Sequence, residues 1–201
     1  MPHMQPIPPD ELPDDISERF AHYKKTRGFT PNSIQTMVRR PNIVRAFMQL
    51  NQAVLYEGTV SEELKMLISL ISSQVAGCRY CQAHMANLSR IYRASDAKIA
   101  AVWEFETSPL FSDAERAALR LAYHGAMTPS QATQADFDEA YRYFSEEEVV
   151  EIVASLALFG FLNRWNDTMA TEIEALPAQV ANETLASGFS WEPGKHNADS
   201  T

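Results

Sequence analysis

Helix start and stop signals recur along most of this chain and leave little room for a β-sheet. Ser112 with Glu115, and Ser145 with Glu148, each match the capping box, in which a serine and a glutamate satisfy backbone donors at a helix start. Apolar residues with helical spacing follow these signals, whereas short alternating runs bounded by hairpin turns are missing. The sequence therefore predicts an all-α fold of eight or nine helices with no sheet. The expected helices cover residues 14–27, 30–40, 41–57, 61–75, 78–92, 95–105, 112–127, 133–143 and 145–176.

The chain of 201 residues has the length of one domain, which we expect to span residues 14–176. Five prolines among the first 13 residues predict an extended arm, residues 1–13, outside the core. Residues 177–201 are polar and lose the helical periodicity, so they are expected to form a C-terminal tail. Two aromatic residues interrupt that tail, Phe189 and Trp191, and we expect them to dock onto a neighbouring subunit.

The charge balance is acidic, because 17 Lys and Arg residues face 26 Asp and Glu residues and the net charge is −9. Such a chain, without a Lys/Arg block, repels phosphate backbones and anionic headgroups, so we expect neither a nucleic-acid nor a membrane partner. No apolar run approaches the roughly 20 residues of a membrane helix. The first residues have neither the basic nor the apolar region of a signal peptide, and the expected compartment is the cytoplasm.

The cysteines Cys78 and Cys81 stand three residues apart, and the sequence contains no others. The loop between them is too small for a disulfide to stabilise a fold of this size, and in a reducing compartment such a pair more often serves redox chemistry or metal binding. On a helix their Cα atoms lie about 5–5.5 Å apart, within disulfide reach. Cys78 follows Gly77 and is expected in a first helical turn, where free N–H groups favour a thiolate. His84, one turn after Cys81, is a candidate base.

Other interpretations of this pair compete with a reactive dithiol. The two cysteines could be small buried residues brought together by chance. A zinc site would need a fourth ligand besides the two thiols and the imidazole, supplied by His22 or His124, and three ligands on consecutive helical turns splay around the axis. Haem attachment requires a histidine directly after the second cysteine, where Gln82 stands. The dithiol interpretation is favoured and needs no metal or organic cofactor, because the two sulfurs hold the redox equivalents.

Polar residues also interrupt the apolar periodicity of the expected helix 145–176. They are Asn163, Arg164, Asn166 and Asp167. Buried polar groups must find partners, so these side chains either form a hydrogen-bonded network between helices or subunits, or line a pocket near the thiols.

The sequence Ser-Gln-Val-Ala-Gly-Cys-Arg-Tyr-Cys-Gln-Ala-His at residues 73–84, preceded by an apolar helix, resembles the core of the AhpD-like branch of the carboxymuconolactone decarboxylase family. The likeness continues through residues 111–119, 144–148 and 158–167 and covers roughly residues 30–175. It implies an AhpD-like orthogonal bundle of helices that assembles into homo-oligomers. Family members that carry the cysteine pair are alkylhydroperoxidases or related thiol peroxidases.

The resemblance also implies roles for individual residues. Cys81 corresponds to the cysteine that attacks the peroxide and becomes a sulfenic acid, and Cys78 to the cysteine that resolves it to a disulfide. A histidine on the same helix and a glutamate on the preceding helix relay the proton in the family, which makes His84 and Glu63 the candidates here. An external dithiol protein or small thiol would then restore both cysteines.

This chain departs from the family pattern at two positions. The family histidine falls at the position of Met85, one residue after His84, and the family glutamate at the position of Met66, one turn after Glu63. The leading hypothesis is therefore a peroxidase or disulfide oxidoreductase that reduces alkyl hydroperoxides through its dithiol. The alternatives are a non-catalytic helical oligomer that senses oxidation or binds zinc, and a lyase of the carboxymuconolactone decarboxylase type.

Overall fold

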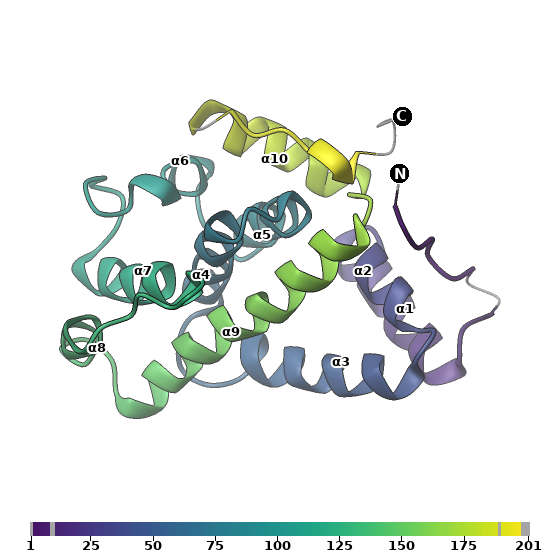
Figure 1. The fold of residues 1–201 in the computed structure, drawn as a ribbon, viewed down its shortest axis with the longest axis horizontal. Coiled ribbons are helices and arrows are strands. Elements are labelled where there is room, and N and C mark those ends of the chain that lie inside the picture. The colour runs from purple at the N-terminus through teal and green to yellow at the C-terminus, as the bar shows by residue number, and fades with distance from the viewer. Residues whose placement is uncertain (1, 9–10, 189, 198–201) are drawn as a thin grey trace.

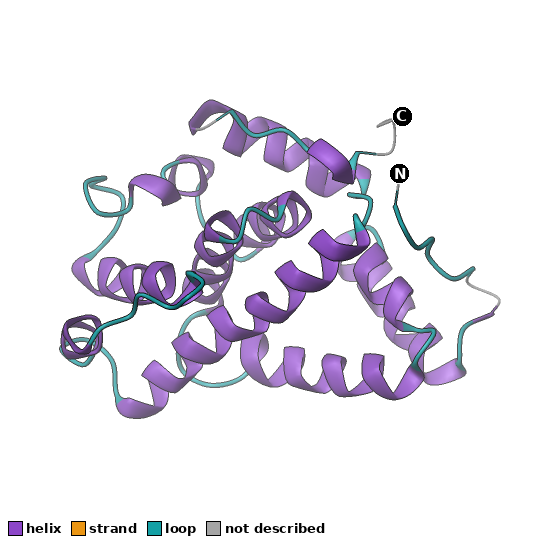
Figure 2. Ribbon diagram, in the orientation of Figure 1, coloured by secondary structure: helices purple, strands orange, loops and turns teal. Residues whose placement is uncertain are grey.

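The computed structural model describes residues 2–8, 11–188 and 190–197, and within them it contains helices and no strand (Figure 2). The all-α prediction is thus confirmed, with ten α-helices in the described residues. The elements are α1 (Asp14–Arg27), α2 (Asn32–Met37), α3 (Pro41–Tyr56), α4 (Glu62–Val75), α5 (Arg79–Ile91), α6 (Asp96–Ala100), the 3₁₀ helix η2 (Val102–Glu104), α7 (Asp113–Ala126), α8 (Gln134–Ala140), α9 (Glu146–Met169), α10 (Ala175–Gly188) and the 3₁₀ helix η3 (Gly194–His196).

The predicted capping boxes begin two of these helices. The Ser112 hydroxyl accepts a hydrogen bond from the backbone of Glu115 at the start of α7, and Ser145 does the same for Glu148 at the start of α9. In both cases the glutamate side chain accepts from the backbone N–H of the serine. These local bonds satisfy donors that a helix start leaves unpaired, which is why the sequence locates these starts correctly.

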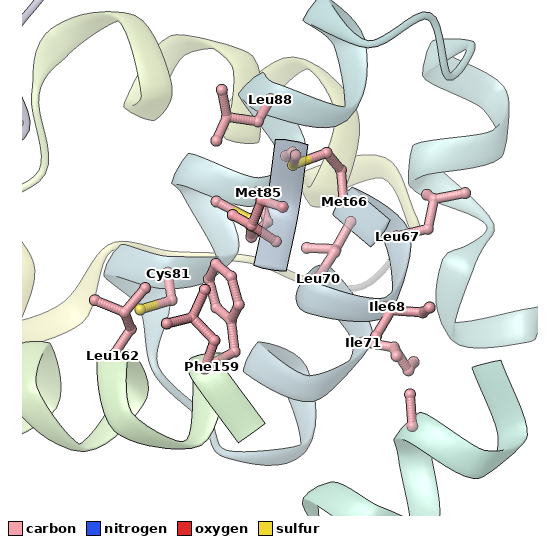
Figure 3. Packing of buried hydrophobic residues seen from close by; sticks show 14 of the residues in the cluster. Met66, Leu67, Ile68, Leu70, Ile71, Cys81, Met85, Leu88, Phe159 and Leu162 are labelled. Carbon is pink, nitrogen blue, oxygen red and sulfur yellow. The ribbon is translucent and has the colours of Figure 1, made fainter. Parts of the chain in front are cut away.

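Helix α4 forms the centre of the core. Its apolar side chains are buried on every face, and it packs against α5, α7 and α9. Figure 3 shows Met66 and Leu70 of α4 in one apolar cluster with Met85 and Leu88 of α5 and Phe159 of α9. The long helix α9 runs diagonally across the molecule, with α3 on one side and α4 and α5 on the other (Figure 1). The pair α4–α5 is therefore enclosed between other helices.

The expectation of a polar tail from residue 177 onward is wrong for most of that segment. Residues 175–188 form α10, which packs along α5 and α6 and buries Val180, Ala181 and Leu185. Pro177 suggested a helix end, but it is the third residue of α10, where a backbone N–H would have no partner inside the helix. The proline is therefore compatible with the first turn of this helix.

The residues after α10 also pack against the body of the protein. Trp191 is buried among core residues of its own chain, so the expected docking onto a neighbouring subunit is wrong for this side chain, while Phe189 lies outside the described residues. Segment 190–197 then brings η3 back to α5. Among the described residues, no helix combines the length and the apolar character that crossing a membrane would require.

Candidate active site

The two cysteines lie where α4 gives way to α5. Gly77 adopts a positive φ of 73°, which permits the turn between the helices, and Cys78 caps the N-terminus of α5. Cys81 follows one helical turn later. Both are free thiols, both are buried, and their side chains share a hydrogen bond. The two thiols thus lie together at the start of α5.

Cys81 faces the long helix α9. The amide Nδ2 of Asn166 donates a hydrogen bond to its Sγ atom over 3.4 Å, and Phe159 and Leu162 pack beside it (Figure 3). Burial raises the pKa of the Cys81 thiol well above its usual value, and the neighbouring Cys78 raises it further. Cys81 is thus the thiol of the pair that keeps its proton at neutral pH.

Cys78 has the opposite electrostatic environment. The hydrogen bond from Cys81 lowers the pKa of Cys78 to about 6, with a further contribution from His196 and against the opposing effect of burial. The first proton that leaves this pair therefore leaves Cys78, in agreement with the helix-start position that the sequence indicated.

A small cavity of about 50 Å³ opens beside Cys81 and is also lined by His84. It has room for roughly four water-sized groups. Its walls are largely apolar and aromatic, with a few polar groups among them. The remaining lining residues are Arg27, Pro31, Ser33, Ile34, Phe47, Asn51, Leu55, Tyr56, Tyr80, Met85, Leu88, Phe159, Leu162 and Asn166.

A second, larger groove of about 980 Å³ lies between α4, α7 and α9. Gln74, Trp103 and Arg164 are among its lining residues, but neither cysteine is. The small cavity, where a thiol and an imidazole meet, is therefore the candidate active site.

His84 is held in the cavity wall by a carboxylate that the sequence did not indicate. Its Nε2 atom lies 2.6 Å from Oε2 of Glu174, which comes from the connection between α9 and α10. The hydroxyl of Tyr80 donates to Oε1 of Glu174 over 3.1 Å, and the backbone N–H of Asn32 donates to the same atom. The Tyr80 ring also stacks on the imidazole at a centroid distance of 4.2 Å. This arrangement fixes the position and orientation of the imidazole ring.

The structure does not bring Glu63 to this cavity. Its carboxylate lies near the start of α4, where it accepts a hydrogen bond from Lys98 Nζ over 2.8 Å, and the cysteines follow the other end of that helix. Glu174 occupies the place beside His84 that the sequence analysis gave to Glu63. No local pattern around residue 174 pointed to this role, because 90 residues separate the two partners.

The two methionines at the departures from the family pattern are buried apolar residues. Met66 is fully buried in the core, and Met85 lines the cavity next to Cys81 (Figure 3).

Within the described residues, no group of three or more His, Cys, Asp or Glu side chains is arranged to hold a metal ion. The described residues therefore provide no set of ligands for the zinc site that the sequence left open.

Comparison with known proteins agrees with this description. The sequence model of the carboxymuconolactone decarboxylase family matches residues 41–124. The structure of the debrominase Bmp8 superimposes with a TM-score of 0.83 and 36% sequence identity, covering 90% of this chain and 97% of that one. A cysteine-to-alanine variant of Bmp8 in complex with 2,3,4-tribromopyrrole gives the same identity and score.

Two further relatives extend the comparison. An alkylhydroperoxidase AhpD core protein from Ralstonia eutropha, described as peroxidase-related, has a TM-score of 0.80 and 24% identity over 88% of this chain and 94% of its own. YnjA from Escherichia coli is 27% identical over 113 residues, which are 56% of this chain and 62% of YnjA. The fold is AhpD-like. This chain belongs to the carboxymuconolactone decarboxylase family.

Proposed function

We propose that this protein is a dithiol peroxidase that reduces small hydroperoxides, with Cys81 as the attacking thiol and Cys78 as the resolving thiol. One observation carries the proposal: Cys81 lines an apolar cavity while it shares a hydrogen bond with a second thiol whose pKa is lowered to about 6. A nucleophile that meets the substrate is thus coupled to a partner that is already ionised at neutral pH.

The first step oxidises Cys81. Its proton passes to the Cys78 thiolate through their hydrogen bond, and the Cys81 thiolate attacks the terminal oxygen of the hydroperoxide. The O–O bond breaks, the alkoxide leaves, and it takes a proton from His84, whose ring Glu174 holds in place. The products are an alcohol and a sulfenic acid on Cys81.

The second step closes the disulfide. Cys78 loses its proton again, and its thiolate attacks the sulfur of the sulfenic acid. The S–O bond breaks, and the hydroxide takes up a proton to leave as water. The net reaction converts a hydroperoxide and two thiols into an alcohol, water and a disulfide. A dithiol protein or a small thiol, as external reductant, then returns the pair to its starting state.

A second candidate function is the reductive debromination of a small aromatic molecule. The 36% identity with the debrominase Bmp8 over nearly the whole chain favours it, as do the aromatic walls contributed by Phe47, Tyr56 and Phe159. In this reaction Cys81 would take bromine from carbon, the carbanion would take a proton from His84, and Cys78 would displace bromide to form the disulfide. The net reaction converts a bromoarene and two thiols into an arene, a disulfide and HBr.

A thiol count by mass spectrometry tests both candidates. The reduced protein is mixed with one equivalent of tert-butyl hydroperoxide or, separately, of 2,3,4-tribromopyrrole. We expect the hydroperoxide to consume both thiols within seconds, with one alcohol and one Cys78–Cys81 disulfide formed per chain. A disulfide formed only with the bromopyrrole, together with released bromide, would replace the first candidate by the second. Two intact thiols under both conditions would contradict both.

A further inference from the structure

The small cavity beside Cys81 has a permanently charged side chain in its wall. Arg27 ends α1, is half-buried, and lines this cavity together with Cys81 and His84. Among the described residues of the lining there is no other arginine or lysine, and no aspartate or glutamate. An arginine keeps its charge at every physiological pH. A molecule in this cavity therefore meets a positive charge that no carboxylate of the wall opposes.

Two tyrosines hold the guanidinium of Arg27 in place. Its Nη2 atom donates a hydrogen bond to the hydroxyl of Tyr56 over 2.6 Å. The guanidinium carbon also lies 4.5 Å from the ring centroid of Tyr23 and 5.9 Å from that of Tyr56, a geometry of cation–π attraction. The hydrogen bond uses one of five N–H donors, and within the described part of the chain no carboxylate pairs with this group. Arg27 is thus oriented but not neutralised.

The chain that follows Arg27 leads directly to the imidazole of the site. The Phe29 ring meets the His84 ring edge-on, with the two centroids 5.4 Å apart. A few residues further, the backbone N–H of Ser33 donates over 3.2 Å to the hydroxyl of Tyr80, whose ring stacks on His84. The end of α1 and the start of α2 are therefore tied to the same imidazole, which keeps Arg27 close to the reacting groups.

The carboxylate next to His84 does not compete for Arg27. One oxygen of Glu174 lies 2.6 Å from Nε2 of His84, and the other accepts from the hydroxyl of Tyr80 and from the backbone N–H of Asn32. Glu174 is also absent from the described residues that line the cavity. Three protein groups thus bind this negative charge, and the positive charge of Arg27 stays available to a ligand.

Positive charge is concentrated in the helices that contribute this wall. Residues 16–56, from the first turn of α1 to the end of α3, contain seven Lys and Arg residues and one acidic residue, Glu18, although the whole chain has a net charge of −9. The seven are Arg19, Lys24, Lys25, Arg27, Arg39, Arg40 and Arg45. Helix ends favour cations, which accounts for some of them without a ligand, but of the seven only Arg27 lines the cavity. The local positive field attracts anions to this wall.

We infer that the substrate of the proposed dithiol reaction is a small organic acid hydroperoxide, whose carboxylate Arg27 binds while its peroxide group meets Cys81. This inference rests on the proposed function and names its substrate class. The planar guanidinium matches the two oxygens of a carboxylate, and a cavity with room for roughly four water-sized groups limits the acid to a short one. Cys81 is 2% exposed and Arg27 is half-buried, so the carboxylate lies at the outer end of the cavity.

The carboxylate of such a substrate is unchanged in the reaction. The O–O bond breaks as before, and the acid hydroperoxide and two thiols become a hydroxy acid, water and a disulfide. Arg27 is therefore a residue that determines specificity, and its contribution depends on the charge of the substrate.

Two hydroperoxides that differ in one group test this inference. 2-Hydroperoxy-2-methylpropanoate is tert-butyl hydroperoxide with one methyl group replaced by a carboxylate, and its amide is the uncharged match. The rate at which each compound oxidises the reduced protein is measured under single-turnover conditions and divided by its rate with free dithiothreitol. With the wild-type protein we expect the acid to react about tenfold faster than the amide, in line with a charge-assisted hydrogen bond.

Three variants assign this preference to one side chain. Arg27→Met removes the charge, so the acid-to-amide ratio should fall to about one, whereas Arg27→Lys keeps a charge without the planar fork and should give an intermediate ratio. Arg19→Met is the matched control, because Arg19 also lies on α1 over the Tyr23 ring, at 5.5 Å, but does not line the cavity. Its ratio should stay within twofold of wild type. A ratio near one in the wild type, or a ratio that Arg27→Met leaves unchanged, would overturn the inference.

A binding measurement separates this inference from the proposed function. 2-Methylpropanoate has the carboxylate but no peroxide, and NMR titration of the reduced protein measures its affinity, with 2-methylpropanamide as the uncharged control. We expect the acid to bind the wild type about tenfold more tightly than it binds Arg27→Met. If neither hydroperoxide oxidises the wild type, the proposed function fails, while binding of 2-methylpropanoate that depends on Arg27 supports the carboxylate site. Equal binding of the acid and the amide to the wild type would overturn that site.

Discussion

Cys78 and Cys81 stand one helical turn apart, yet the molecule gives them different surroundings. Cys78 caps a helix, lies next to His196 and has a pKa lowered to about 6. Cys81 lies inside the same helix, receives a hydrogen bond from Asn166, meets the cavity and has a raised pKa. The thiol that ionises more easily is therefore not the thiol that lines the cavity.

We expect the largest effect from the two variants that each remove one thiol. Cys81→Ser and Cys78→Ser should each lower steady-state hydroperoxide turnover by about 100-fold or more, because each removes one half of the dithiol. Only Cys78→Ser should still consume one equivalent of hydroperoxide and leave a sulfenic acid, which mass spectrometry after dimedone labelling detects. A sulfenic acid on Cys78 in the Cys81→Ser variant, formed at the wild-type rate, would reverse the assignment.

The next effect concerns the carboxylate that supports His84. Glu174→Gln removes the carboxylate that orients the imidazole, and we expect single-turnover oxidation of Cys81 to slow about tenfold. His84→Ala should slow it at least as much. Glu63→Gln is the matched control, since Glu63 binds Lys98 away from the cavity, and its rate should stay within twofold of wild type. A slow Glu63→Gln variant beside an unaffected Glu174→Gln variant would restore the relay expected from the sequence.

The pH dependence of thiolate formation tests the difference between Cys78 and Cys81. A lowered pKa means that the thiolate is present above that pKa and is lost as pH falls through it. Thiolate absorbance at 240 nm should therefore rise by one thiolate per chain around pH 6, with the second thiol still protonated well above that pH. Because the bond from Cys81 is the main cause, Cys81→Ala, which leaves no donor, should move the transition of Cys78 to higher pH. A single transition of both thiols near pH 8 to 9 would contradict the difference in pKa between Cys78 and Cys81.

The smallest effect should come from Asn166. Asn166→Leu keeps the volume of the side chain and removes the N–H donor to Cys81, so we expect the oxidation of Cys81 to slow about threefold, in line with roughly 0.5–1 kcal/mol for one hydrogen bond. The melting temperature should change little, because the Oδ1 atom of Asn166 is already buried without a partner. A loss above about tenfold, measured by single-turnover kinetics, would give Asn166 a larger role than tuning one thiol.

Local patterns predicted more of the fold than of the site. Capping boxes located α7 and α9, because their hydrogen bonds join residues three apart. The same locality placed Cys78, Cys81 and His84 on one helix. The sequence did not predict helix α10, because Pro177 suggested the end of a helix. The packing of α10 against α5 stabilises the helix in the folded protein. The sequence analysis did not indicate Glu174, because 90 residues separate it from His84 and no spacing within a single sequence encodes such a contact.

The sequence by itself determined the helical class, the dithiol spacing and the place of the first cysteine at a helix start, since all three follow from a repeat of 3.6 residues per turn and its unpaired end groups. Only the tertiary structure decided which thiol is ionised, which one meets the cavity, and which carboxylate and imidazole stand beside them. The reason is physical: a pKa depends on burial and on charges within a few ångströms, and folding brings those groups together from distant parts of the chain.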